Sequence, residues 1–470
     1  MHWLLIGYMF LFIDRPYEVW PWLGEIHLER LYMLFTLGVW VLYPHKRWVG
    51  NSLQAGVLGL AAVILLSWLL SPWSERGQPV VEDWFKVLVF YLLLVTTVRD
   101  EAGLRRLVVG FVGVMALYQL HSLREYLGGR HTYRMGIARM IGVDQTMGDP
   151  NTFGASLVVA LPLVWAVWQS RVGGRWGRAA CLAYAALSIL CILLTGSRSA
   201  FLGLLACGAL VLGKSRRRWG MLALAALLAP LVLLALPPSL QNRFLTIVDP
   251  SVGPKNAQES GQGRIEGFFT GLALWQAYPL TGVGPGAWRP ATGSKLESHN
   301  LYGQILGELG TAGLFAFVCL LAAFRSNIRR LRRLGQEYPF LQDWLPLTLA
   351  RAIGMAVLLL LLLGLFGHNL YRYTWLWYAG FLILARHVAE HYLAEPCLAG
   401  QYLAEQYPVE QYSVEQHLPS WLLEEPQEIE DVAGEEEVQV GEALPAEEPG
   451  VDENVRETEL PLATPISDPI

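Results

Sequence analysis

The amino-acid sequence predicts an all-α, polytopic integral membrane protein with about twelve transmembrane helices. Of its 470 residues, 53% are hydrophobic and only 16% are charged, which is more apolar surface than a soluble domain buries. The apolar residues also come in blocks of membrane-spanning length. In addition, basic residues recur in alternate connections between these blocks, and this recurrence sets an orientation for the chain.

The apolar blocks define the predicted spans in chain order. They are 2–13, 31–43, 52–70, 84–98, 104–123, 153–170, 179–195, 199–213, 219–236, 300–324, 346–366 and 374–392. The first two are short, and the connection at 14–30 could be re-entrant. The N-terminal run has neither a basic flank nor a small-residue cleavage site, so we expect it to be retained as a span rather than removed as a signal peptide.

Orientation follows from the basic connections. These contain Lys46 and Arg47; Arg99, Arg105 and Arg106; Arg171, Arg175 and Arg178; Lys214, Arg216, Arg217 and Arg218; and Arg325, Arg329, Arg330, Arg332 and Arg333. Because short cytoplasmic loops are enriched in Lys and Arg, this side is predicted to be cytoplasmic. The long connections at 124–152 and 237–299 then lie outside, together with short turns at 71–83, 196–198 and 367–373.

The C-terminal region differs from the rest. Residues 1–394 form the predicted membrane domain, with 34 basic and 20 acidic residues, whereas residues 395–470 hold 20 acidic residues against the single Arg456. This tail has too little apolar surface to offset the entropy of ordering, so we expect a disordered cytoplasmic segment. Its loose repeat at 404–417 leaves a docking role for a partner open.

Two motifs at predicted outer span ends combine polar and charged residues. In GDPNTFGASL (148–157), Asp149 or Asn151 could simply cap a helix, and a helix start can also present its N–H groups to an anion. In LTGSRSAF (194–201), Arg198 lies outside, against the general bias of basic residues. It either extends toward lipid head groups or binds a phosphate through its planar fork.

Two further motifs lie in and after the large outer loop. Arg264 occurs in GQGRIEGFF, and the glycine-rich stretch at 279–288 predicts a tight turn rather than a dinucleotide site, since no βαβ unit surrounds it. Ser298-His299-Asn300 then begins a span, with Glu308 about 2.5 helical turns further on. A histidine at this boundary either packs at a helix end or meets the head group of a lipid-linked substrate. His368-Asn369 repeats the dipeptide after the eleventh predicted span.

As a set, these motifs resemble the O-antigen ligase and polymerase superfamily, which includes lipopolysaccharide O-antigen ligases, repeat-unit polymerases and some protein O-oligosaccharyltransferases. The resemblance covers residues 130–325 in motif detail and the rest of the chain in topology only. It implies that Arg198 and Arg264 bind a lipid-linked diphosphate and that His299 is the catalytic base. The supporting candidates are Asp149, Asn151, Asn300 and Glu308.

The resemblance implies a glycosyltransferase in the bacterial inner membrane with its active site facing the periplasm. A glycan would pass en bloc from undecaprenyl diphosphate to an acceptor hydroxyl, with arginines offsetting charge on the leaving diphosphate and a histidine taking the proton. The acceptor could be lipid A core, a protein serine or another glycan, and ligase-type transfer is slightly favoured over polymerisation. Membrane lipid surrounds the protein, and no nucleic acid is an expected partner.

No cofactor or metal is expected. The acidic residues of the outer loops are scattered, and the five cysteines lack metal-ligand spacing. A different class, a transporter or lipid-linked glycan flippase, would instead place ionisable residues near mid-membrane and show two related halves. A scaffold with a degenerate site is a third alternative.

Overall fold

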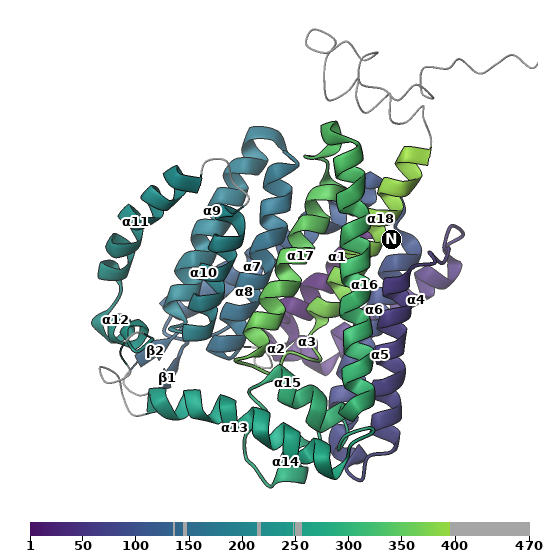
Figure 1. Ribbon diagram of the computed structural model, residues 1–470. Coiled ribbons are helices and arrows are strands. Elements are labelled where there is room, and N and C mark those ends of the chain that lie inside the picture. The colour runs from purple at the N-terminus through teal and green to yellow at the C-terminus, as the bar shows by residue number, and fades with distance from the viewer. Residues whose placement is uncertain (135–136, 144–147, 214–217, 248, 250–255, 395–470) are drawn as a thin grey trace, which may run out of the picture. The chain divides into compact units, whose positions relative to one another are not determined.

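The computed structural model describes residues 1–134, 137–143, 148–213, 218–247, 249 and 256–394, which form a bundle of helices (Figure 1). The α-helices are α1 (His2–Ile13), α2 (Pro16–Val19), α3 (Pro21–Glu25), α4 (Leu28–Leu42), α5 (Ser52–Leu69), α6 (Ser74–Thr97), α7 (Glu101–Leu127), α8 (Pro150–Gln169), α9 (Gly174–Leu194), α10 (Arg198–Leu212), α11 (Arg218–Ala235), α12 (Pro238–Leu245), α13 (Asn256–Ala277), α14 (Trp288–Thr292), α15 (Leu301–Gln304), α16 (Gly310–Glu337), α17 (Leu345–Gly364) and α18 (Tyr373–Ala394).

Three short elements complete the described part. A π-helical turn, η2 (Ile305–Leu309), joins α15 to α16, and a 3-10 turn, η3 (Pro339–Leu341), follows α16. The strands β1 (Thr132–Arg134) and β2 (Ile137–Arg139) pair antiparallel. The all-α prediction missed this hairpin because three-residue strands are too short to give a periodic signal.

The predicted helical membrane architecture is confirmed in its coarse form. Each of the twelve apolar segments lies on a helix or helical run of its own. Among the described helices, six are long and apolar enough to cross a membrane, namely α5, α7, α8, α9, the run from Leu301 to Glu337, and α17. The number twelve stays a prediction.

The centre of the bundle is α18. Its side chains Trp375, Trp377, Tyr378 and Phe381 are at most 1% exposed, and the helix packs against α5, α6, α7, α16 and α17. Packed aromatic side chains bury the largest areas, so this helix anchors the helices around it. Helix α17 also packs against α8 and α10, and residues from the start of α8 lie near residues from the end of α17.

The predicted outer connections lie together at one end of the bundle. The hairpin, α12, α13, α14 and α15 all lie at the lower end in Figure 1. The connection at 237–299 is not an irregular loop, because it contains α12, α13 and α14. Likewise the turn predicted at 71–83 is helical from Ser74 onward, since a search for apolar runs overlooks the charged first turns of α6.

Glycines bring α13 close to the start of the tenth predicted span. Gly263, Gly267 and Gly271 recur every fourth residue along α13, so they share one side of the helix. A Cβ at Gly271 would overlap the backbone of Gly303, and a Cβ at Gly303 would overlap that of Gly267. The absence of side chains at these contacts allows α13 to lie directly against α15 and η2.

Several predictions concern residues outside the described part of the chain. They are the acidic tail at 395–470 with its repeat at 404–417, and the basic residues Lys214, Arg216 and Arg217.

Candidate active site

The first motif begins α8 with a helix cap. Asp149 Oδ2 accepts a hydrogen bond of 2.9 Å from the Thr152 backbone N–H, as expected of an acidic residue at this position. Asn151 has a different role: its Oδ1 accepts bonds from Arg139 Nη2 (3.1 Å) and from Ser197 Oγ (2.9 Å). Asn151 therefore links the hairpin, the start of α8 and the start of α10.

The second motif places Arg198 at the start of α10. Ser197 caps this helix by accepting from the Ala200 N–H at 3.3 Å, so the side chain of the next residue projects from the first turn. The half-buried Arg198 donates from Nη1 to Thr246 Oγ1 at 3.2 Å. This contact joins the second motif to the end of α12.

Arg264 lies on α13 and faces the end of α17. Its guanidinium carbon is 5.2 Å from the ring centroid of Phe366, within the range of a cation–π contact. Burial, and secondarily the charge of Arg198, lower the pKa of Arg264. Two guanidinium groups that disfavour each other's charge in a partly buried place are stabilised by an anion between or beside them.

His299 is exposed, whereas both its neighbours are buried. Asn300 caps α15 through Oδ1, which accepts from the backbone N–H groups of Tyr302 (2.9 Å) and Gly303 (3.0 Å). Ser298 Oγ donates to the Asn300 carbonyl at 2.9 Å. The predicted supporting residue Asn300 thus fixes the backbone on which His299 is presented.

A cavity of about 540 Å³ joins these motifs. Its lining includes Asp149, Asn151, Arg264 and His299 from the sequence-predicted set. Arg198 does not line it, but its neighbour Ser199 does. The predicted candidates around this first cavity therefore come from α8, α13 and the segment before α15, with α10 contributing through Ser199.

His368 also lines the first cavity, and its ring centroid is 5.7 Å from that of His299. Desolvation by the surrounding protein, followed by the charge of Arg372 and the neighbouring His299, lowers the pKa of the exposed His368 to about 4. The imidazole is therefore neutral at neutral pH. Arg372 lines the same cavity and donates to Ser156 Oγ at 3.1 Å.

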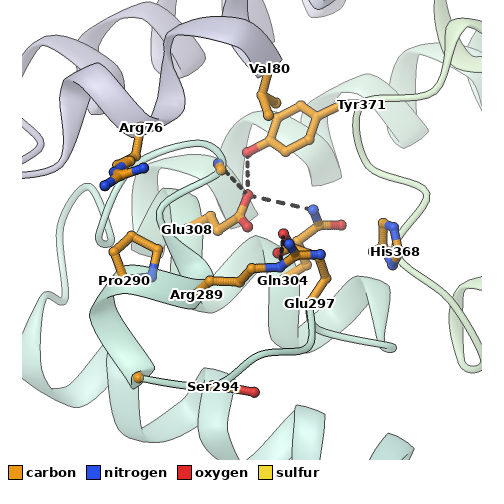
Figure 2. A pocket seen from close by; sticks show the side chains of 12 residues that line it. Arg76, Val80, Arg289, Pro290, Ser294, Glu297, Gln304, Glu308, His368 and Tyr371 are labelled. Carbon is orange, nitrogen blue, oxygen red and sulfur yellow. Dashed lines mark hydrogen bonds and ion pairs between the residues drawn. The ribbon is translucent and has the colours of Figure 1, made fainter. Parts of the chain in front are cut away.

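Glu308 lies apart from the first cavity. It is 1% exposed within η2 and lines a second cavity of about 600 Å³, shown in Figure 2. Its Oε2 accepts from Tyr371 Oη at 2.7 Å, from the Gly286 N–H at 3.3 Å and from Gln304 Nε2 at 3.5 Å. Glu308 is thus held by three donors rather than facing His299 directly.

The glycine-rich stretch that supplies one of these donors is a tight turn, as predicted. Gly282, Gly284 and Gly286 have φ values of 67°, 104° and 68°, a region that glycine adopts without steric cost. The turn brings its backbone against η2, where the N–H groups of Val283 and Gly284 donate to the carbonyls of Gly307 and Glu308.

Comparison with known proteins finds one family model that matches part of the chain. Residues 183–318 match the family model described as O-antigen ligase. This match supports the resemblance of that segment to the O-antigen ligase and polymerase superfamily. No curated protein matches the chain.

The segment that matches the O-antigen ligase model extends from α9 into α16. It includes Arg198, Arg264, His299, Asn300 and Glu308, whereas the remaining candidates Asp149 and Asn151 precede it.

Sequence reasoning missed the contributions of the segment between α17 and α18. His368 was noted only as a repeated dipeptide outside the matched motifs, yet it lines both cavities. Asn369 and Arg372 line the first cavity, and Tyr371 lines the second. The available signal was a cluster of polar and aromatic residues directly after an apolar span, where such residues need a specific role.

Within the described ranges, no group of three or more His, Cys, Asp or Glu side chains is arranged to hold a metal ion. The two cavities are lined by arginine, histidine, carboxylate, amide and hydroxyl side chains.

Proposed function

We propose that the chain is an O-antigen ligase-like glycosyltransferase that transfers a glycan en bloc from undecaprenyl diphosphate to an acceptor hydroxyl. The observation that carries this proposal is the first cavity, where Arg264 and His299 meet although 34 residues separate them in the sequence. Arg198 lies close enough for its charge to act on Arg264. The family match supports the same reaction class.

The reaction needs one anion-binding group and one base. As the acceptor oxygen bonds to the anomeric carbon, the bond between that carbon and the diphosphate oxygen breaks. Arg264 and Arg198 offset the charge on the departing diphosphate, an electrostatic role that preorganised donors perform well. His299, exposed at the cavity, takes the proton of the acceptor hydroxyl.

The position of the cavity favours transfer over transport. The candidate residues lie at helix starts and in connections, such as Asp149 at the cap of α8 and His299 before α15. A flippase would need ionisable residues along a path through the middle of the bundle. Placement of the cavity on the periplasmic face of the inner membrane is part of the proposal, and it rests on the alternation of basic connections.

Three single substitutions test the proposed roles. In nanodiscs, His299→Ala should reduce transfer of a lipid-linked glycan by about 10²-fold or more while leaving donor binding intact. Arg198→Ala and Arg264→Ala should weaken donor binding, and lysine at either position should restore it only in part, because a point charge lacks the planar fork. The measurements are donor binding and glycan transfer by purified protein with a chelator present.

Arg130→Ala is the matched control, because Arg130 lies in a connection at the same end of the bundle and lines neither cavity. It should keep wild-type binding and transfer. Wild-type turnover by His299→Ala would exclude this histidine as the base. Full donor binding by both Arg198→Ala and Arg264→Ala would exclude these two arginines as the groups that bind the diphosphate.

A further inference from the structure

Arg139, on strand β2 of the hairpin, is a buried positive charge behind the first cavity. It is only 3% exposed. Its Nε donates to the Thr195 carbonyl at 2.7 Å, and its Nη2 donates at 3.1 Å to Oδ1 of Asn151, which lines the cavity. A buried charge is unfavourable unless hydrogen bonds hold it, and the reaction proposed above gives this arginine no role.

Arg139 determines which way the amide of Asn151 faces. A guanidinium has only N–H donors, so the atom of Asn151 that faces it has to be the oxygen. Ser197 Oγ shares that oxygen at 2.9 Å. A hydroxyl both donates and accepts, however, so Ser197 would accommodate the nitrogen equally well. Of the two partners, only the arginine excludes the flipped amide.

With its oxygen toward Arg139, Asn151 directs its N–H groups to the cavity side. Its Nδ2 donates to Asp149 Oδ1 at 3.4 Å, and this bond is exposed, so that a ligand in the first cavity can reach both side chains. Because an amide nitrogen carries two N–H groups, a donor is available to a ligand beside the Asp149 acceptor. An adjacent donor and acceptor match a hydroxyl group, which both accepts and donates.

The charges around the first cavity separate a place for the diphosphate from a place for the sugar. The charge of Arg198 acts on Arg264, and two guanidinium groups together favour an anion. The charge of Asp149 acts instead on His368, and a carboxylate repels an anion placed beside it. A neutral sugar hydroxyl therefore suits the pair of Asp149 and Asn151 better than a phosphate oxygen does.

The histidine side of the cavity is also where the reacting carbon has to lie. The ring centroid of His299 is 5.7 Å from that of His368, on which the charge of Asp149 acts. In the proposed reaction, the anomeric carbon lies between the diphosphate and the acceptor hydroxyl that His299 deprotonates. This carbon belongs to the first sugar of the donor, which would thus lie beside Asp149.

We propose that Asn151 and Asp149 bind a hydroxyl of the first sugar of the lipid-linked donor, and that Arg139 is a positioning residue that keeps the N–H groups of Asn151 directed into the first cavity. This inference rests on the proposed function, in which the same cavity holds the donor. Neither side chain gains or loses a proton. They hold the sugar while its bond to the diphosphate breaks.

Donors that differ only in the sugar test the binding role. Kd is measured in nanodiscs for undecaprenyl diphosphate alone and for undecaprenyl diphosphate carrying glucose, galactose or N-acetylglucosamine. The ratio of the first Kd to the lowest of the others is the sugar preference. Asn151→Asp keeps an oxygen for Arg139 and Ser197 but removes the N–H donors, and Asn151→Ala removes both. In each variant the sugar preference should fall about tenfold, as expected for one lost hydrogen bond.

The same ratio tests the positioning role of Arg139. In Arg139→Gln the amide of Asn151 can turn over, so the sugar preference should fall by a factor comparable to that in Asn151→Ala. Arg139→Lys should restore most of it, because an ammonium group also only donates. The double variant should lose no more than Asn151→Ala alone, since Arg139 acts through Asn151. Additive losses would overturn the positioning role, whereas a general loss of structure would weaken binding of all the donors alike.

Asn327→Asp is the matched control. Asn327 Oδ1 accepts from Arg386 Nη1 at 3.1 Å and from Asn51 Nδ2 at 2.9 Å, so it is also an arginine-bound amide, but it lines neither cavity. This variant should keep the wild-type sugar preference.

The outcomes separate this inference from the function on which it rests. If wild type prefers none of the three sugar-linked donors, or if both Asn151 variants keep the preference, the sugar site is overturned. If wild type does not bind undecaprenyl diphosphate at all, the proposed function itself fails, and the inference fails with it.

Discussion

At the scale of single residues, two histidines in one cavity have different environments. Both side chains are exposed, but His299 is framed by the buried Ser298 and Asn300, whereas the protein around His368 and the charge of Arg372 lower the pKa of His368 to about 4. Because the two rings are 5.7 Å apart, His368→Ala is no distant control for His299→Ala. A neutral His368 can donate or accept one hydrogen bond at the junction of the cavities without adding charge.

The lowered pKa of His368 predicts a dependence of stability on pH. The unfolded chain binds a proton at this histidine with a pKa of about 6.5, more tightly than the folded chain does. The contribution of the neutral His368 to the free energy of unfolding is therefore fully present above pH 6.5 and is lost as the pH falls toward about 4. Because the His368 side chain is exposed, solvent screening makes this loss smaller than the full pKa shift would give. Between pH 8 and pH 4 in detergent, the thermal unfolding temperature should therefore fall less steeply for His368→Gln than for wild type.

His131→Gln is the control for this comparison, since His131 is exposed and lines neither cavity. Its unfolding profile should follow that of wild type. Equal slopes for wild type and His368→Gln would contradict the lowered pKa of His368.

Residue-level predictions succeeded where the interaction is local. Asp149 and Asn300 cap their helices through bonds to N–H groups two or three residues ahead, a pattern that sequence alone contains. The contact between Glu308 and Tyr371 spans 63 residues and depends on the π-helical turn. Such partners are decided by tertiary packing, so the sequence did not predict that Glu308 lines the second cavity rather than the first.

At the scale of elements, the site depends on how closely α13 approaches α15. Apolar runs located the spans well, since they report burial in lipid or protein core. They gave no indication of α13, whose residues combine glycines, charged side chains and exposed Ile265 and Phe269. Yet α13 carries Arg264, and its contact with Gly303 holds that arginine at the same cavity as His299.

Gly271→Ala should disturb this contact. The added methyl group would overlap the backbone of Gly303, which cannot rotate away as a flexible side chain can. We expect a loss of about 1–3 kcal/mol in the free energy of unfolding, together with reduced transfer because Arg264 moves relative to His299. Thermal unfolding and glycan transfer, measured on the same preparation, check both effects.

The control is Gly113→Ala on α7, where a Cβ would meet nothing within 4 Å. In a helix interior this change is stabilising by up to about 1 kcal/mol, and transfer should be unaffected. If Gly271→Ala behaves like Gly113→Ala, close packing of α13 is not what aligns the two catalytic candidates.

At the scale of the whole molecule, the number of membrane crossings decides which face carries the site. The helix α1 has 12 residues and α4 has 15, which correspond to about 18 and 22 Å at 1.5 Å per residue. A bilayer core is about 30 Å thick. These two helices therefore cross only where neighbouring helices or a thinned bilayer shield their ends, and the alternation of basic connections is the main argument that they do cross.

Cysteine labelling distinguishes the arrangements. With twelve crossings, single cysteines at Glu25 and Gln262 should react with an impermeant reagent added outside intact cells, whereas those at His45 and Gln336 should react only after permeabilisation. All four positions are exposed in the structure, so a failure to react reports the membrane rather than burial. If the cysteines at Glu25 and His45 react from the same side, α4 does not cross the membrane. Outside labelling at Gln336 with none at Gln262 would move both cavities to the cytoplasmic face, where a periplasmic acceptor is excluded.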